Sequence, residues 1–134
     1  MTEDERIERV ATLWDRALPH LEDALAHASG THRIEDVFRA LSAGELTLWM
    51  GERCAGVSEI LVFPRRRVLN LFLVGGDLHE MRKLQPGIEA YARAQACAAM
   101  MFHGRMTAAA KTASGWARAW PDYDPKWICL TKEL

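Results

Sequence analysis

Three short apolar segments, joined by links of only a few residues, constrain the fold of this chain more than any other feature. They occupy residues 46–50 (LTLWM), 56–63 (GVSEILVF) and 68–74 (VLNLFLV). Short apolar runs bounded by turn residues are typical of β-strands. Parallel neighbours need a crossover of about a dozen residues or more, and these links are far shorter. The sequence therefore predicts an antiparallel meander in the middle of the chain.

Two helices are predicted before the meander. Thr2 and Glu5 have the spacing of a capping box, so the first helix begins near Glu3. Its apolar residues recur at steps of three and four, which places one stripe on a buried face: Ile7, Val10, Trp14, Ala17, Leu21 and Ala24. Pro19 lacks an amide hydrogen and is predicted to kink or divide this helix.

The second helix is predicted between Thr31, as its cap, and Gly44, as its stop. Its inner face carries Ile34, Val37, Phe38 and Leu41.

After the meander, the sequence alternates between helices and strands. A helix is predicted from Leu78 to Ala96, beginning properly only near Pro86, and an apolar strand at 97–104. An alanine-rich helix at 106–119, a loop at 121–125 and a strand at 127–133 complete the chain. This order predicts an α/β (α+β) fold, with an antiparallel meander followed by a βαβ unit in one mixed sheet.

Length and composition exclude several classes of protein. The 134 residues predict a single domain, with a helical segment at 1–30 and a core at 31–134. The net charge of −1 and the small basic cluster Arg65–Arg67, without interleaved aromatic residues, argue against nucleic acid as a partner. No signal peptide or membrane-spanning segment is visible. Three widely spaced cysteines, Cys54, Cys97 and Cys129, do not form a metal-binding pattern.

The order of elements, with a glycine turn after the third strand, resembles the core of the GNAT acyl-CoA N-acyltransferase superfamily over residues 33–134. In that family a loop of pattern Q/R-x-x-G-x-G/A holds the pyrophosphate of acetyl-CoA at the start of the next helix. The matching stretch here is VGGDLH, residues 74–79. Only part of the family pattern is present, because Leu78 and His79 stand where small residues are expected.

Several details are similar to a group of short GNAT-like proteins encoded by phages and prophages. The shared motifs are LSAGELTLW (41–49), VLNLFLVGGDL (68–78), the pair Ala96-Cys97, the pair Gly104-Arg105, and GWAR (115–118). This resemblance implies a role in the cytoplasm of a bacterial host or inside a virion.

The glycine turn has two interpretations. Glycines permit close approach to the backbone, and a helix N-terminus attracts anions. Under an enzymatic interpretation, Gly75, Gly76, Asp77, Leu78 and His79 hold the pyrophosphate of acetyl-CoA, and Arg105 is a further phosphate ligand. Under the alternative, the turn is structural and Asp77 caps the helix with the carboxylate that excludes phosphate.

The candidate catalytic residues are few. Glu59 lies within a predicted strand, and His103 at the end of another, so either is a candidate base for the acceptor amine. The resemblance implies a tyrosine acid, for which Tyr123 is the candidate. Each also has an ordinary structural interpretation, because no partner is identifiable from the sequence.

Two functions therefore remain open. The first is a non-catalytic GNAT-like phage or prophage protein that acts through protein contacts as a virion or assembly component. Such a protein needs no cofactor, and its partners are other phage structural proteins or further copies of itself. Five tryptophans are many for this length, and tryptophan is enriched at protein interfaces, which favours such contacts. The second is an acetyl-CoA-dependent N-acetyltransferase. Neither function calls for a metal.

Overall fold

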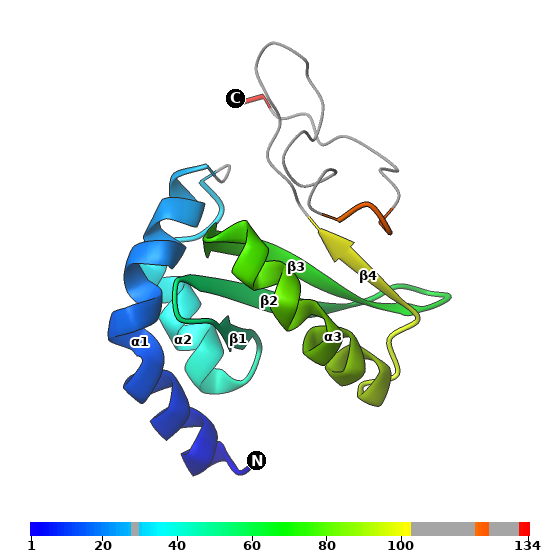
Figure 1. Cartoon of the computed structure of the whole chain (residues 1–134), viewed down its shortest axis with the longest axis horizontal. Helices are drawn as coiled ribbons and strands as arrows, with labels where there is room; N and C mark the ends of the chain where they lie inside the picture. Colours follow the sequence, from blue (N-terminus) through cyan, green and yellow to red (C-terminus); the bar gives the residue numbers. More distant parts are fainter. Residues whose placement is uncertain (28–29, 103–119, 124–131) are drawn as a thin grey trace. The chain divides into compact units, whose positions relative to one another are not determined.

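The computed structural model describes residues 1–27, 30–102, 120–123 and 132–134. These fall into two compact units, Met1–His103 and Gly104–Leu134, which are described separately. All the helices and strands assigned in the described residues belong to the first unit (Figure 1). The predicted helix at 106–119 and most of the predicted strand at 127–133 lie outside the described residues. Lys132 and Glu133, at the end of that predicted strand, are not in a strand.

The first unit is built on a four-stranded mixed sheet. Its strands lie in the order β1 (Thr47–Met50), β2 (Cys54–Val62), β3 (Arg67–Gly76) and β4 (Ala99–Phe102). β1, β2 and β3 are antiparallel neighbours, and β4 runs parallel to β3. The crossover from β3 to β4 contains helix α3 (Leu78–Ala94). This confirms the predicted meander and the βαβ unit that follows it.

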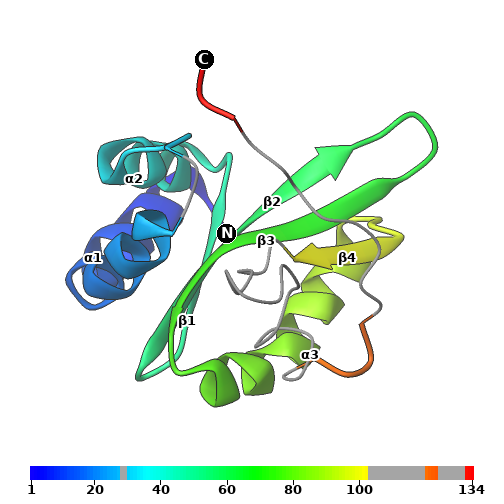
Figure 2. The ribbon, with the colours of Figure 1, turned by 90° about the horizontal axis from the view of Figure 1, so that it is seen from above.

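Helices cover both faces of the sheet (Figure 2). Helices α1 (Glu3–Ala26) and α2 (Ile34–Ala43) share a buried core with Leu48, Val57 and Leu73 of the sheet. The next residue along β1, Trp49, packs edge-on against Tyr91 of α3, with ring centroids 5.4 Å apart. Because neighbouring residues of a strand point to opposite faces, α3 lies on the face opposite α1 and α2.

Helix α1 begins at its predicted capping box. The Glu5 amide donates to Thr2 Oγ1 at 3.1 Å, and the Thr2 amide donates to Glu5 Oε2 at 2.9 Å. The helix continues through Pro19 to Ala26, so Pro19 does not divide it. Burial begins only at Val10: Ile7, predicted to be on the inner face, is 43% exposed because the first turns extend beyond the core.

Helix α2 differs from the prediction at its start. Its N-cap is Arg33 and not Thr31, and the Asp36 carboxylate accepts the Arg33 amide at 2.8 Å. Gly44 ends it as predicted, in the left-handed conformation at φ 81°. Phe38 lies at the rim of the core, 38% exposed, with its ring 4.8 Å from that of Trp14.

A β-bulge interrupts the pairing of β2 with β3. Val57 pairs with Leu73 and Ser58 with Leu71, so Phe72 is the additional residue on β3. Phe72 and Leu73 both pack on the core shared with α1 and α2. Bulges bend a strand and leave a backbone group outside the ladder, and they are common beside active sites.

Helix α3 begins at Leu78, the predicted start of this helical span, and not near Pro86, where the helix was predicted to begin properly. Asp77 caps it, so the chain is helical directly after the glycine turn. None of the helices in the described residues is long and apolar enough to cross a membrane.

Candidate functional site

The two glycines of the turn are required by packing. A Cβ on Gly75 would collide with the carbonyl oxygen of His20 in α1. Gly76 has φ +93°, and a Cβ there would collide with the carbonyl oxygen of Arg53 in the turn between β1 and β2. Glycine is favoured at such positions because it has no side chain and tolerates positive φ. Both glycines therefore have a structural role whether or not a ligand binds.

Asp77 is the N-cap of α3, as the structural interpretation predicted. Its Oδ1 accepts the Glu80 amide at 3.2 Å, and its own amide donates to the Arg53 carbonyl at 2.9 Å. The Glu80 amide is the largest cause of a lowered pKa at Asp77, with contributions from the His79 amide and the Arg53 charge. The carboxylate thus uses amides that an anion at this helix end would otherwise meet.

Glu80 joins the first turn of α3 to the β1–β2 turn. Its Oε1 accepts the Arg53 amide at 2.9 Å, and its Oε2 lies 3.4 Å from Arg53 Nε. The Arg53 amide is also the main cause of the lowered pKa of Glu80. Arg53 Nη2 lies 3.8 Å from Asp77 Oδ2, so a single guanidinium faces both carboxylates.

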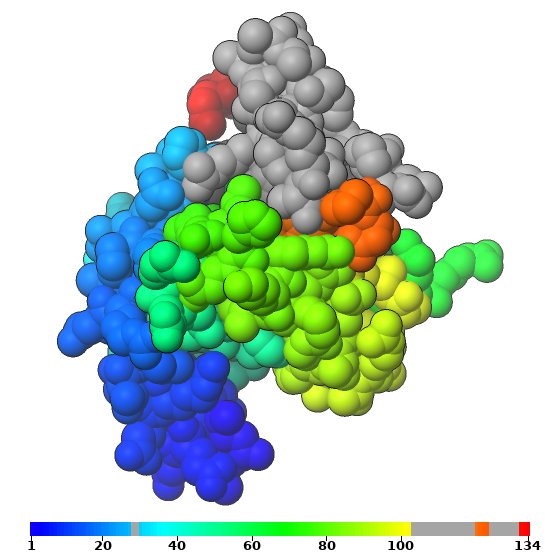
Figure 3. All heavy atoms as spheres, viewed as in Figure 1, coloured from blue at the N-terminus to red at the C-terminus, as the bar shows by residue number. Residues whose placement is uncertain are grey.

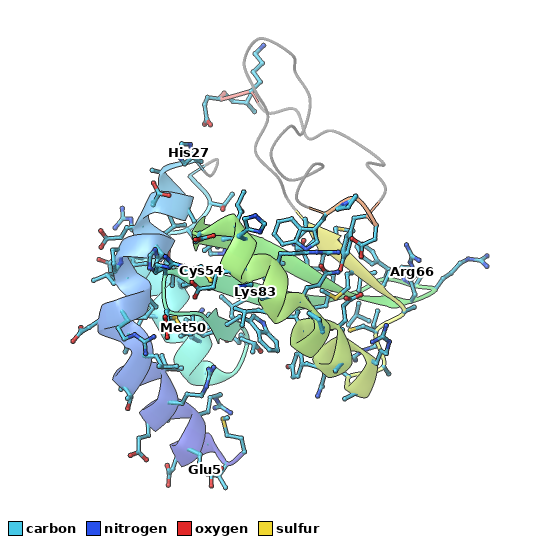
Figure 4. The ribbon with its side chains drawn as sticks, viewed as in Figure 1. Glu5, His27, Met50, Cys54, Arg66 and Lys83 are labelled. Carbon is cyan, nitrogen blue, oxygen red and sulfur yellow. The ribbon has the colours of Figure 1, made fainter. Side chains whose placement is uncertain are left out.

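A cavity of about 390 Å³ opens beside this network. Lys83, one of its lining residues, is labelled in Figure 4. It is lined by Gly51, Glu52, Arg53, Asp77, His79, Glu80, Lys83 and Leu84. Arg53, Lys83 and the N-terminus of α3 favour an anionic ligand. The three carboxylates in the lining disfavour an anionic ligand. A phosphate therefore fits only if the Arg53 side chain turns from Asp77 and Glu80 toward the ligand.

Cys54 lies behind the cavity but is not poised as a nucleophile. Its side chain is fully buried, and its Sγ donates to Glu80 Oε1 at 3.8 Å. Burial, with the nearby Glu80 charge, raises the pKa of this thiol to about 11. Because the thiolate is the reactive form, Cys54 is inert at neutral pH.

Glu59 is half-buried in the middle of β2. Its Oε1 accepts a hydrogen bond from Asn70 Nδ2 at 3.0 Å, and Asn70, its cross-strand neighbour, is fully buried. Glu59 is two residues from Val57 and therefore shares the face that carries α1 and α2. The Asn70 amide therefore fixes the position of the Glu59 carboxylate on this face of the sheet.

Three candidates from the sequence remain, and the described residues do not test them as a site. His103 and Arg105 lie outside the described residues. Tyr123 lies in a turn of the second unit, where its amide donates to the Trp120 carbonyl at 3.0 Å. Over residues 1–27, 30–102, 120–123 and 132–134, no three His, Cys, Asp or Glu side chains form a group that could hold a metal ion.

No sequence pattern identified Arg53, Glu80 or Lys83 as site residues. Arg53 belongs to the link GERC, which reads only as a turn, and Glu80 and Lys83 read as ordinary helix-surface charges. The pairing of β1 with β2 brings that link to the end of β3, where Arg53 meets Glu80. The spacing of Glu80 and Lys83 placed them on one helix face, but nothing in the sequence identified what that face meets.

The carboxylate network predicts an acid-sensitive stability. Asp77 and Glu80 both have a lowered pKa in the folded protein. Their contribution is fully present above the unfolded-state pKa values of roughly 4 and is lost as the pH falls through the lower folded-state values. At pH values below about 4, the urea concentration at the unfolding midpoint is expected to decrease. The decrease with falling pH should be less steep in Glu80→Gln than in the wild type. Exposed Glu22→Gln is the control and should follow the wild-type curve; parallel curves for all three proteins would contradict the assignment.

Comparison with known proteins supports the fold. Neither a family model nor a curated protein matches the sequence. Among solved structures, the chain is similar to an aminoglycoside acetyltransferase, meta-AAC0020, from an uncultured soil metagenomic sample, in complex with sisomicin. The TM-score is 0.61 at 11% identity, covering 100% of this chain and 93% of that one.

Two further solved structures agree with it. TTHA1254 from Thermus thermophilus has a TM-score of 0.57 at 13% identity, covering 100% of this chain and 93% of that one. A probable acetyltransferase has a TM-score of 0.55 at 10% identity, covering 96% of this chain and 95% of that one. The described helices and mixed sheet have a GNAT-like fold, as these solved structures do.

Proposed function

We propose that this chain is an acetyl-CoA-dependent N-acetyltransferase whose cofactor binds at the junction of β3 and α3. The observation that carries the proposal is the cavity of about 390 Å³ at the N-terminus of α3, with Arg53 and Lys83 in its lining. It occupies a strand–turn–helix junction of the kind that binds phosphates in many folds. The solved neighbours of this fold include acetyltransferases, which favours the enzymatic interpretation over the protein-contact one.

The carboxylates at this junction do not exclude a pyrophosphate. The Arg53 side chain is 76% exposed, and its ion pairs with Glu80 and Asp77 are 3.4 and 3.8 Å long. Exposed ion pairs of this kind contribute little to stability. A bound pyrophosphate would therefore compete for Arg53 at low cost, and Lys83 would add a second cation.

The proposed chemistry uses the candidates from the sequence. Acetyl-CoA would supply the acetyl group as an activated thioester. Glu59, held by Asn70, or His103 would take the proton of the acceptor amine. Tyr123 would donate its hydroxyl proton to the leaving sulfur. The bulge at Phe72 lies between Glu59's cross-strand partner Asn70 and the glycine turn, so β3 would connect the acceptor end to the pyrophosphate end.

Thermal unfolding with added acetyl-CoA tests this proposal. Binding at about 100 times the Kd adds about 2.7 kcal/mol to the free energy of unfolding, so the Tm should rise by several degrees. Pantetheine, which lacks the pyrophosphate, should give no such rise. Arg53→Gln with Lys83→Gln should abolish the shift, whereas Arg65→Gln, distant in the β2–β3 turn, should retain it. Release of free thiol with sisomicin or another primary amine would then report acetyl transfer.

Asp77→Asn gives a sharper prediction about the anion site. Asparagine caps helices as well as aspartate does, so the fold should be retained. The substitution removes one negative charge beside the proposed pyrophosphate, and the affinity for acetyl-CoA is expected to increase, by roughly tenfold for each 1.4 kcal/mol of repulsion relieved. A titration monitored by Tm or by calorimetry measures the change. Equal or weaker binding would count against a phosphate at this helix end.

A second function is favoured by the same network. The Asp77 carboxylate and Glu80 already bind the amides and the guanidinium at the helix start, which suits a turn that holds no ligand. Under this proposal the chain is a non-catalytic phage or prophage protein that acts through protein contacts in a virion or its assembly. Wild type and Asp77→Asn would then both ignore acetyl-CoA, and the purified protein would bind an assembly component instead.

A further inference from the structure

The turn between β2 and β3, called the hairpin tip below, combines exposed apolar side chains with arginines. Val62 is 72% exposed and Phe63 45% exposed, and Arg65 and Arg66 follow after Pro64. The tip stands clear of the rest of the first unit in Figure 3, and Figure 4 shows Arg66 pointing away from the sheet. Residues 60–67 contain no carboxylate. The Phe63 amide donates to the Arg66 carbonyl at 2.9 Å, so a closed turn presents these side chains.

A groove of opposite character lies on the exposed side of α1. It has a volume of about 350 Å³ and is lined by Glu5, Glu8, Arg9, Thr12 and Leu13. The Arg9 guanidinium donates to the Leu48 carbonyl at 3.1 Å, and Arg6 to the Ser42 carbonyl at 3.1 Å, so both arginines are tied to the protein body. The neighbouring carboxylates Glu3, Asp4 and Glu8 remain exposed. The groove therefore offers negative charge beside the partly buried side chain of Leu13.

The tip of one molecule cannot reach its own groove. α1 and the hairpin tip lie at opposite sides of the first unit in Figures 1 and 2. The described tryptophans of this unit, Trp14 and Trp49, are half-buried and are occupied by ring contacts within the chain. The tip and the groove are thus two exposed features, of opposite charge, that suit a contact between molecules.

We propose that the hairpin tip of one copy docks in the α1 groove of a second copy. Phe63 would cover Leu13, and Arg65 and Arg66 would face Glu5 and Glu8. Opposite charges around an apolar contact direct association and set its register. Because two different surfaces meet, the contact is heterologous, and repetition gives a ring or a filament rather than a symmetric dimer. The inference does not depend on whether the chain is an enzyme.

Charge reversal on each surface tests the pairing. The reversed-tip variant carries Arg65→Glu and Arg66→Glu. The reversed-groove variant carries Glu8→Lys and Glu5→Gln, since glutamine retains the capping box with Thr2. Sedimentation velocity over a range of protein concentrations measures association, with circular dichroism as the check that each variant is folded. Arg93→Glu, an exposed residue in the last turn of α3 that belongs to neither surface, is the matched control.

The expected results are specific to this pairing. Wild type and Arg93→Glu should associate as concentration increases, and less strongly in high salt, because salt screens exposed charges. Each reversed variant alone should associate roughly tenfold or more weakly, a loss of about 1.4 kcal/mol. An equimolar mixture of the two reversed variants should recover association, since every tip then meets a groove of opposite charge. Monomeric wild type, undiminished association of either variant, or no recovery in the mixture would overturn the proposal. So would wild type that stays monomeric yet binds vesicles containing phosphatidylserine through the tip.

Discussion

Gly75→Ala is expected to reduce the free energy of unfolding by about 3 kcal/mol or more. The added Cβ would overlap the carbonyl oxygen of His20, which belongs to the backbone of α1 and cannot move like a flexible side chain. To relieve the overlap, α1 would have to shift away from β3, and the core that they share would lose packing. Urea denaturation monitored by circular dichroism measures the change.

Gly87→Ala is the matched control for this substitution. Gly87 lies in the exposed part of α3, where a Cβ would meet nothing within 4 Å. Alanine is the better helix former, so this variant should gain about 0.5–1 kcal/mol. If Gly75→Ala were as well tolerated as Gly87→Ala, the close approach of α1 to the glycine turn would be wrong.

Leu21→Ala is the second substitution with a large expected effect. Leu21 is fully buried in the core that α1 and α2 form with the sheet. Removing three carbon atoms leaves a cavity that rigid neighbours cannot fill, and the expected loss is about 2–5 kcal/mol. Equilibrium urea unfolding, with tryptophan fluorescence as the signal, measures it.

Ile7→Ala on the same helix is the control for Leu21→Ala. Both residues belong to the apolar stripe read from the sequence, but Ile7 is 43% exposed. Its removal should cost less than about 1 kcal/mol, because little apolar surface leaves a packed environment. Comparable losses at both positions would show that the first turns of α1 are buried in solution. That result would contradict the exposure of Ile7 in the structure and the accessibility of the α1 groove.

Much of the fold of the first unit could be predicted from local patterns. The short links between residues 46 and 74 left an antiparallel meander as the only connection, and the strands formed there. Three helix ends were predicted correctly: the start of α1 at Thr2 and Glu5, the end of α2 at Gly44, and the start of α3 at Asp77. Capping of this kind depends on neighbouring residues alone. The helix starts predicted at Thr31 and Pro86 were wrong, and Pro19 does not divide α1, for a different reason. Tertiary packing kept α1 and α3 continuous through their prolines, and Asp36 capped α2 from within.

The candidate site was predictable only in part. The glycine turn and the Asp77 cap are local, and the sequence placed both correctly. Arg53 lies 24 positions before Asp77, and no periodicity or motif connects the two. They meet because β1 and β2 pair as a hairpin that returns the link between them to the end of β3.

The sequence by itself determined the order of the strands, the helix caps at Thr2, Gly44 and Asp77, and the place of the glycine turn, because these depend on interactions within a few residues. Only the tertiary structure decided why those glycines are needed. The carbonyl oxygen of His20 lies where a Cβ on Gly75 would be, and that of Arg53 lies where a Cβ on Gly76 would be. The tertiary structure alone also showed that Arg53 and Glu80 join Asp77 at the start of α3. Contacts between distant segments depend on how the layers pack, and no local pattern records that packing.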